Sequence, residues 1–292
     1  MTTVATQAEL VAAVPLMKSG DTLTCVGDFV NFPLKTRVDN IAFDCTKARF
    51  SGDTYTKNLN GFHVLGGTFG GVNPLRVDGG SDIAVEGALL LGPPERLGNA
   101  MSVSAIKGLK VSGAVKNFKN GLVATDVEGF TLTKLAFEGM RLDGIQGVAM
   151  RSGRFSEVTV HGTRRLANDH SDALQLRNLS TLPPCADIVV EDCEFVGDTQ
   201  GLDLTHKTGD GDFKNLTVRR VRTNVAWGNG IALLAVKGLT VDDCRVVTYP
   251  LAANQSRLYV AADCTDVRWA GLPSSYAPYG NKPGWSSAGT AP

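Results

Sequence analysis

The residues best suited to acid–base chemistry gather in two short stretches of this chain. His170 stands two residues before Asp172, and Asp203 is followed closely by His206 and Lys207. An imidazole or an amine can remove a proton from carbon, whereas glycoside hydrolysis needs a pair of carboxyl groups. We therefore predict that His170, Asp172, Asp203 and Lys207 form a catalytic group, with His206 beside it.

Repeated segments surround these residues and predict how they are positioned. Six segments can be laid over one another at intervals of about 20 to 30 residues, a period typical of stacked repeats. They are Asn99-Ala-Met-Ser-Val, Gly121-Leu-Val-Ala-Thr, Asp143-Gly-Ile-Gln-Gly, Asp172-Ala-Leu-Gln-Leu, Gln200-Gly-Leu-Asp-Leu and Asn229-Gly-Ile-Ala-Leu.

A second repeat lies between the members of the first and alternates with a period of two, as β-strands do. Its copies begin at Ile83, Leu109, Phe130, Ile188, Leu216 and Leu239, with a weaker copy at Phe155. Helical segments are not indicated between them, and glycine, at 33 of 292 residues, suits the corners of a coil. Because one coil cannot bury its inner face alone, the pattern predicts an all-β parallel solenoid with a continuous core.

The two ends of the chain differ from the repeats. Thr6 and Glu9 have capping-box spacing, which predicts a short helix within an N-terminal cap at residues 1–20. We expect the solenoid domain to span residues 1–266. Residues 267–292 are rich in Pro, Gly and Tyr and are expected to form an irregular tail.

Reading down the columns of the first repeat locates a candidate binding surface. The position after the inward apolar residue reads Gln146, Gln175, Asp203 and Ala232, and it should face outward because side chains alternate along a strand. A second polar column reads Asp143, Asp172, Gln200 and Asn229. We predict substrate-binding roles for Gln146, Gln175, Arg177, Arg141, Asp198, His206 and Trp227. The alternative is that the polar columns only cap turns and stabilise the stack.

Three stretches resemble the pectin-lyase-like family of right-handed, single-stranded parallel β-helices. They are the opening pattern Ala8-Glu-Leu with Ser19-Gly-Asp-Thr-Leu, the coil repeats, and Asn168-Asp-His-Ser-Asp-Ala-Leu-Gln, which is similar to a His-x-Asp-x-x-Gln signature of carbohydrate-active members. The resemblance covers roughly residues 4 to 265. It implies a right-handed β-helix acting on polysaccharide, since members are lyases, glycoside hydrolases, epimerases and phage tailspikes. The Asp-Asp and Gly-His-Gly motifs of polygalacturonases and the acidic calcium cluster of pectate lyases are not evident, so no cofactor is assigned and Ca²⁺ stays open.

Two chemistries remain open at this point. A lyase would use His170 or Lys207 as base and Arg177 or Gln175 to neutralise a uronate carboxylate. A hydrolase would pair Asp203 with another carboxyl group, either Asp172 or Asp198. The arginines near the groove suit carboxylate recognition, so we expect an acidic polysaccharide as substrate. The alternative is a non-catalytic, receptor-binding or structural β-solenoid of a phage tail. Whether it cleaves polysaccharide or only binds it, a phage tail protein of this kind is expected to be a homotrimer.

Composition narrows the partners and the compartment. Lys plus Arg equals Asp plus Glu at 29 each, so binding to nucleic acid is not expected. No apolar run reaches the ~18 residues of a membrane span, and the first residues lack the features of a signal peptide. We expect a virion-associated or otherwise extracellular-acting protein. Cys193 and Cys244 fall at one register two coils apart, and are predicted to be buried apolar residues rather than a disulfide.

Overall fold

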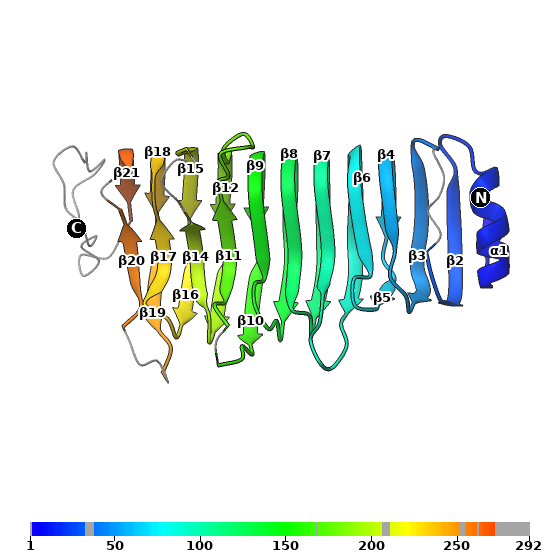
Figure 1. Cartoon of the computed structure of the whole chain (residues 1–292), viewed down its shortest axis with the longest axis horizontal. Coiled ribbons are helices and arrows are strands. Elements are labelled where there is room, and N and C mark those ends of the chain that lie inside the picture. The colour runs from blue at the N-terminus through cyan, green and yellow to red at the C-terminus, as the bar shows by residue number, and fades with distance from the viewer. Residues whose placement is uncertain are drawn as a thin grey trace.

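The computed structural model describes residues 2–32, 38–167, 169–205, 211–250, 255–261 and 263–271. Over these residues the chain winds into a parallel β-solenoid of about 11 turns. The coils stand side by side in a single row, with the N-terminal helix at one end (Figure 1). The predicted all-β class, a parallel β-helix with a short N-terminal helix, is confirmed.

The N-terminal half contains the short cap and the longest strands. Its elements are β1 (Thr2–Val4), α1 (Gln7–Ala13), the 3-10 helix η1 (Val14–Leu16), β2 (Thr22–Phe29), β3 (Ile41–Phe50), β4 (Tyr55–Leu65), β5 (Thr68–Gly70), β6 (Leu75–Leu91), β7 (Asn99–Lys116) and β8 (Asn120–Glu138). Each strand pairs in parallel with its counterpart in the next coil, as β6 does with β7 and β7 with β8.

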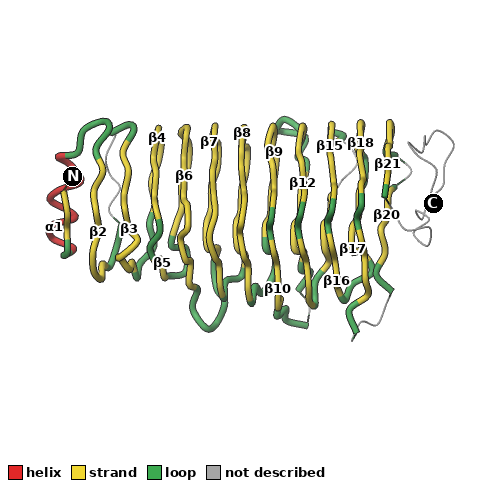
Figure 2. The backbone as a smooth tube through the Cα atoms, turned by 180° about the vertical axis from the view of Figure 1, so that it is seen from behind, coloured by secondary structure: helices red, strands yellow, loops and turns green. Residues whose placement is uncertain are grey.

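The C-terminal half has shorter strands separated by longer connections. Its elements are β9 (Ile145–Ser156), β10 (Thr159–Thr163), β11 (Asp172–Arg177), β12 (Ala186–Glu191), β13 (Glu194–Gly197), β14 (Gln200–Thr205), β15 (Phe213–Arg219), β16 (Arg222–Val225), β17 (Asn229–Leu233), β18 (Val236–Asp242), β19 (Arg245–Thr248), β20 (Arg257–Val260) and β21 (Thr265–Ala270). The longer loops gather mostly along one edge of the row (Figure 2).

The cap forms as its sequence predicts. The Thr6 hydroxyl accepts a hydrogen bond from the Glu9 backbone N–H, and the Glu9 carboxylate accepts one from the Thr6 N–H. The apolar side of α1 buries Leu10 completely. A helix at this place covers the open end of the core, which would otherwise expose apolar side chains to water.

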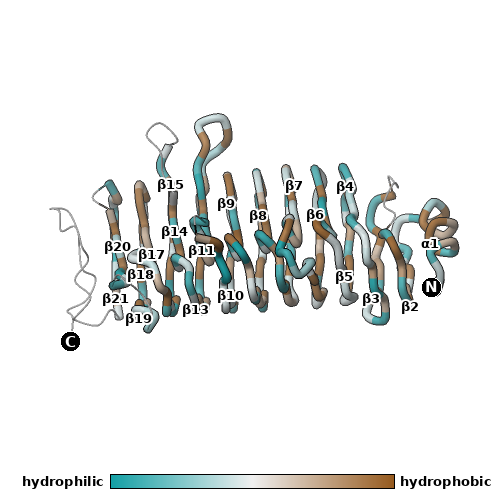
Figure 3. The backbone as a smooth tube through the Cα atoms, turned by 60° about the horizontal axis from the view of Figure 1, so that its bottom comes forward, coloured by the Kyte–Doolittle hydropathy of each residue, from teal (hydrophilic) through white to brown (hydrophobic). Residues whose placement is uncertain are grey.

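The interior is a continuous stack of apolar side chains from successive coils. The rings of Phe29, Phe50 and Phe69 stack in a ladder with centroid separations of 5.1 and 4.9 Å. Apolar and polar stretches alternate along the coils (Figure 3). Burying one side of every coil in this way supplies the main stabilisation of a solenoid.

One corner of the coils formed by β7, β8 and β9 is built from residues whose backbone adopts the left-handed αL conformation. Ala105, Asp126 and Ala149 have φ of 52°, 55° and 53°, and the strand register stacks them directly above one another. A left-handed conformation costs a non-glycine residue about 1–2 kcal/mol. The register holds each of them there because the strands on both sides of the corner are paired.

The strand register corrects two of the predicted alignments. Asn99 pairs with Asn120, so the second copy of the first repeat begins one residue before Gly121. Leu122 and Val123 are both apolar, and alternation therefore did not fix the register there.

In the second repeat, Gly153 rather than Phe155 occupies the position of Phe130 in the next coil. A side chain at Gly153 would overlap the ring of Phe130, which explains why this copy lacks the usual apolar residue.

The last described strand crosses the position where we expected the solenoid to end. β21 pairs with β18, and Val267 continues the column of Leu239. Regular pairing therefore extends to Ala270, beyond the predicted boundary at residue 266. Residues 272–292, which hold most of the predicted tail, lie outside the described residues.

Candidate functional site

The predicted outward column is present on three successive coils. Gln146 of β9 pairs with Gln175 of β11, and Gln175 pairs with Asp203 of β14. Asp172 is the first residue of β11, and His170 belongs to the connection that leads into this strand from β10. The fold therefore brings five of the predicted site residues together.

His170 and Asp172 form the central contact of the site. Nδ1 of His170 lies 3.3 Å from Oδ2 of Asp172, whose carboxylate is 1% exposed, while the imidazole is 55% exposed. The hydrogen bond to Asp172 is the main cause that raises the pKa of His170, and the charges of Asp203 and Asp143 act in the same direction. A buried carboxylate thus orients an accessible imidazole.

Two amides fix the second ring nitrogen of His170. Asn229 donates through Nδ2 to Oε1 of Gln200 at 3.2 Å, so the Gln200 nitrogen is the group that faces Nε2 of His170, at 2.7 Å. An amide nitrogen is a donor only. In the neutral imidazole, Nε2 therefore accepts from Gln200 and Nδ1 carries the proton towards Asp172. Gln200 was predicted as a column residue, but its contact with His170 was not foreseen.

The outward glutamines support the buried carboxylate. Gln175 donates through Nε2 to Oδ2 of Asp172 at 2.7 Å, and its Oε1 accepts from Nε2 of Gln146 at 3.2 Å. Both ends of the Gln175 amide are therefore engaged within the protein. Gln175 therefore helps to orient Asp172, and its predicted role in binding or neutralising a substrate carboxylate stays a prediction.

Asp143 is a second buried carboxyl group at the site. Its Oδ1 accepts the backbone N–H of Asp172 at 2.9 Å, and the side chain lies in the column that continues through Asn120 and Asn99. Burial, followed by the negative charge of Asp172, raises the pKa of Asp143 to about 7. The polar column therefore links successive coils by hydrogen bonds and also holds two carboxyl groups beside His170.

Trp227 borders the imidazole. Its ring meets His170 edge to face at a centroid distance of 5.3 Å, and the guanidinium of Arg165 lies 4.8 Å from the Trp227 ring centre. Arg165 also pairs with Asp198 at 3.0 Å. Trp227 and Asp198 thus belong to the site's neighbourhood, although Arg165 covers part of the ring that was predicted to stack on a sugar.

The remaining predicted residues lie at the border of the site or outside the described residues. Arg141 forms a two-point ion pair with Asp169, at 2.8 and 3.1 Å. Arg177 lies near enough to Asp143 for its charge to counteract the rise in that carboxyl's pKa. His206 and Lys207 lie outside the described residues, so their predicted roles are untested.

The carboxyl groups predicted to serve a hydrolase differ from His170 in their exposure and their partners. Asp172 is 1% exposed and already accepts from His170 and Gln175, so its oxygens have little access to a glycosidic bond. Asp198, the other predicted partner of Asp203, is held by Arg165. The His170 imidazole is 55% exposed, so a proton-abstracting base is one chemistry that this site could support.

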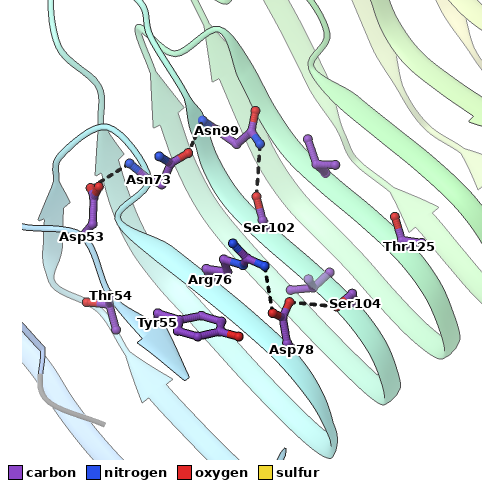
Figure 4. A pocket seen from close by; sticks show the side chains of 12 residues that line it. Asp53, Thr54, Tyr55, Asn73, Arg76, Asp78, Asn99, Ser102, Ser104 and Thr125 are labelled. Carbon is purple, nitrogen blue, oxygen red and sulfur yellow. Dashed lines mark hydrogen bonds and ion pairs between the residues drawn. The ribbon is translucent and has the colours of Figure 1, made fainter. Parts of the chain in front are cut away.

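A separate pocket on the same face was missed by sequence reasoning. Its volume is about 610 Å³, and Tyr55, Arg76, Asp78 and Thr125 are among the residues that line it (Figure 4). The signal was available, because Asn73-Pro-Leu-Arg-Val is in register with Asn99-Ala-Met-Ser-Val. Extending the six-segment overlay by two coils towards the N-terminus would have placed Arg76 and Tyr55 in the outward column.

The described residues contain neither a metal-binding cluster nor a membrane-spanning helix. Within the described ranges, no group of three or more His, Cys, Asp or Glu side chains is arranged to hold a metal ion. Ca²⁺ therefore remains unassigned. Among the same residues, no helix has the length and apolar character needed to cross a membrane.

Comparison with known proteins gives likeness at the level of fold. No family model and no curated protein matches the sequence. The chain is a parallel β-helix protein. Similar solved structures include DFA-IIIase from Arthrobacter chlorophenolicus A6 without its lid, with a TM-score of 0.48, 10% identity and coverage of 88% of this chain and 65% of that chain.

Two further similar structures are the enzymatically active domain of tailspike protein 2 from Bacteriophage CBA120 and an alginate lyase from Paenibacillus sp. str. FPU-7. The TM-scores are 0.49 and 0.31, and the identities are 13% and 14%. The match to the tailspike domain covers 85% of this chain and 43% of that chain. The match to the alginate lyase covers 92% of this chain and 94% of that chain. Function has to be inferred from this chain's own side chains.

Proposed function

We propose that this β-helix binds an acidic polysaccharide and cleaves it by β-elimination, with His170 as the base. The observation that carries the proposal is the contact between the accessible His170 imidazole and the buried carboxylate of Asp172, 3.3 Å apart. A carboxylate in this position holds the ring in one tautomer and stabilises the imidazolium once a proton has been taken.

The reaction proceeds through Nε2 of His170. Gln200 donates to this atom in the free protein, so a substrate must take the place of that amide. Nε2 then accepts the proton from the carbon next to the uronate carboxylate, and the C–H electron pair forms the new carbon–carbon double bond. The neighbouring C–O bond breaks, and the departing oxygen acquires a proton from solvent or from a protein group.

Arg177 is our candidate for neutralising the uronate carboxylate. It follows Gln175 by two residues on β11 and therefore emerges on the same outward face. No ion pair of Arg177 occurs among the residues that the structure describes. Arginine presents two parallel N–H donors to a carboxylate, and this contact would strengthen as charge develops during proton removal.

The proposal is tested by incubating the protein with a panel of acidic polysaccharides. β-Elimination gives a rise in ultraviolet absorbance from the unsaturated uronate together with new reducing ends. New ends without the absorbance would assign a hydrolase. Binding without either product would favour the non-catalytic receptor-binding or structural protein.

We further propose a homotrimer that acts on polysaccharide outside the cell, as part of a phage tail. The elongated shape of the solenoid (Figure 1) supports this proposal, because such a shape suits three copies placed side by side. Light scattering coupled to size exclusion measures the mass in solution. A monomer at micromolar concentration would contradict the trimer without affecting the proposed chemistry.

A further inference from the structure

The pocket near the N-terminal end lies on the same outward column as the proposed catalytic group. Arg76 pairs with Ser102, Ser102 with Val123, Val123 with Gln146, and Gln146 with Gln175. Coils are spaced by ~4.8 Å, so four steps separate Arg76 from Gln175 by about 19 Å. A polysaccharide that runs along the coils can therefore occupy the pocket and the His170 site together.

Internal contacts fix the pocket's charged and aromatic side chains. The Arg76 guanidinium lies 4.8 Å from the centre of the Tyr55 ring and pairs with Asp78 at 3.0 Å. Asp78 also accepts a hydrogen bond from the Ser104 hydroxyl at 2.8 Å. These groups line a hollow on the coils of β4, β6 and β7, with Thr125 of β8 on its far side (Figure 4).

The charge of the pocket favours a neutral ligand. Its lining carries two carboxylates, Asp53 and Asp78, and one cation, Arg76. Asp78 compensates the charge of Arg76 at 3.0 Å, and Asp53 adds a further negative charge that disfavours an incoming carboxylate. Carboxylate oxygens, amides and hydroxyls pair well with the donors and acceptors of sugar hydroxyls.

We propose that this pocket binds a neutral, hydroxyl-rich sugar unit. The inference rests on the proposed function and deepens it: the substrate would be a heteropolysaccharide in which neutral sugars accompany the uronate that is cleaved. The pocket is then a distal recognition site, and specificity for the repeating unit arises from the fixed spacing between it and His170.

The direct test is saturation-transfer NMR on the intact chain with D-galactose and D-galacturonate as separate probes at equal concentration. We expect transfer to galactose to exceed transfer to galacturonate. Tyr55→Ala should weaken the galactose signal about three- to tenfold, as expected for a contact worth ~1 kcal/mol. Tyr259→Ala is the matched control, because Tyr259 continues the same outward column at the other end and also lies beside an arginine, at 5.4 Å.

A second variant tests the charge argument itself. Asp78→Asn keeps the shape of the side chain but releases Arg76 from its counter-charge. We expect this variant to gain binding of galacturonate. Wild-type binding of galacturonate above galactose, equal losses in Tyr55→Ala and Tyr259→Ala, or no transfer to either sugar would each overturn the proposal.

Failure of this proposal is distinguishable from failure of the proposed reaction. Binding is measured with monosaccharides and needs no cleavage, so it stands or falls without His170. With a cleavable polysaccharide, Tyr55→Ala should raise KM and leave kcat near the wild-type value. A fall in kcat with unchanged KM would contradict a distal recognition role.

Discussion

His170 and Asp172 are separated by 3.3 Å between Nδ1 and Oδ2, yet they differ sharply in their access to water. The carboxylate lies at the start of strand β11 and is buried, whereas the imidazole comes from the preceding connection and is half exposed. The rigid solenoid thus holds the orienting group and leaves the titrating group accessible. A base that must reach a polymer needs this combination.

Replacing His170 removes the proposed base and leaves the core intact. We expect His170→Gln to lower kcat by about 10²–10⁴-fold, the usual contribution of a general base. The matched control is His161→Gln, because His161 is also exposed and lies 3.3 Å from a carboxylate, that of Glu194. Initial rates of unsaturated product formation measure both variants. Equal activity of the two variants would remove His170 from the mechanism.

The activity should depend on pH through His170. Its hydrogen bond to Asp172 raises the pKa of the imidazole above the ordinary 6.5. A base works when it is unprotonated, so activity should fall as pH decreases through a midpoint above 6.5. Asp172→Asn removes the stabilising charge and should move this midpoint to lower pH while reducing kcat. A midpoint that stays in place would show that another group limits the rate.

The raised pKa of Asp143 should make the free energy of unfolding depend on pH. Burial raises its pKa from 3.8 to about 7, so between these values the folded state binds more protons than the unfolded state. Stability therefore falls as pH rises from about 4 to 7, and each pKa unit corresponds to ~1.4 kcal/mol. Asn at position 143 stays neutral at every pH. At pH values above about 7, Asp143→Asn should therefore raise the free energy of unfolding by on the order of a few kcal/mol, and Tm with it.

The same variant should have a small effect near pH 4, where the wild-type carboxyl group is already protonated in the folded state. Asp187→Asn is the control, since exposed Asp187 also accepts a side-chain hydrogen bond, from Asn215 at 2.8 Å. Calorimetric melts across pH measure the difference. A uniform shift of Tm at every pH would indicate a packing effect rather than a titration.

Side-chain alternation explains how much of this structure the sequence predicts. Gln146, Gln175 and Asp203 are in the expected register because the apolar residues beside them must face the core. Where alternation is lost, as at Leu122 and Val123, the predicted register slips by one residue. The alternation with a period of two therefore predicts the strand register, and the predicted register is wrong where the alternation is locally lost.

Contacts made by connections are harder to predict than contacts within strands. Gln200 meets the His170 imidazole because the loop before β11 folds back over the next coil, and repeat periodicity does not describe such a path. Burial is likewise a property of the whole stack, so the sequence does not show that Asp172 is only 1% exposed. The pocket at Arg76 is within reach of the repeat pattern, because Leu75 is in register with Met101 and continues the first repeat towards the N-terminus.

The cysteines give a prediction that is independent of function. All six are buried as free thiols, and burial raises the pKa of Cys193 to about 12 and that of Cys244 to about 11. Val221 lies between Cys193 and Cys244 in the stack, which separates them by two coils or about 10 Å, too far for a disulfide. Since the thiolate is the reactive form, a thiol reagent such as DTNB should label the native protein very slowly and all six thiols after denaturation. Rapid labelling of Cys193 or Cys244 in the native protein would mean that the coils open at this point, and would contradict the continuous core on which the positions of His170 and Asp172 depend.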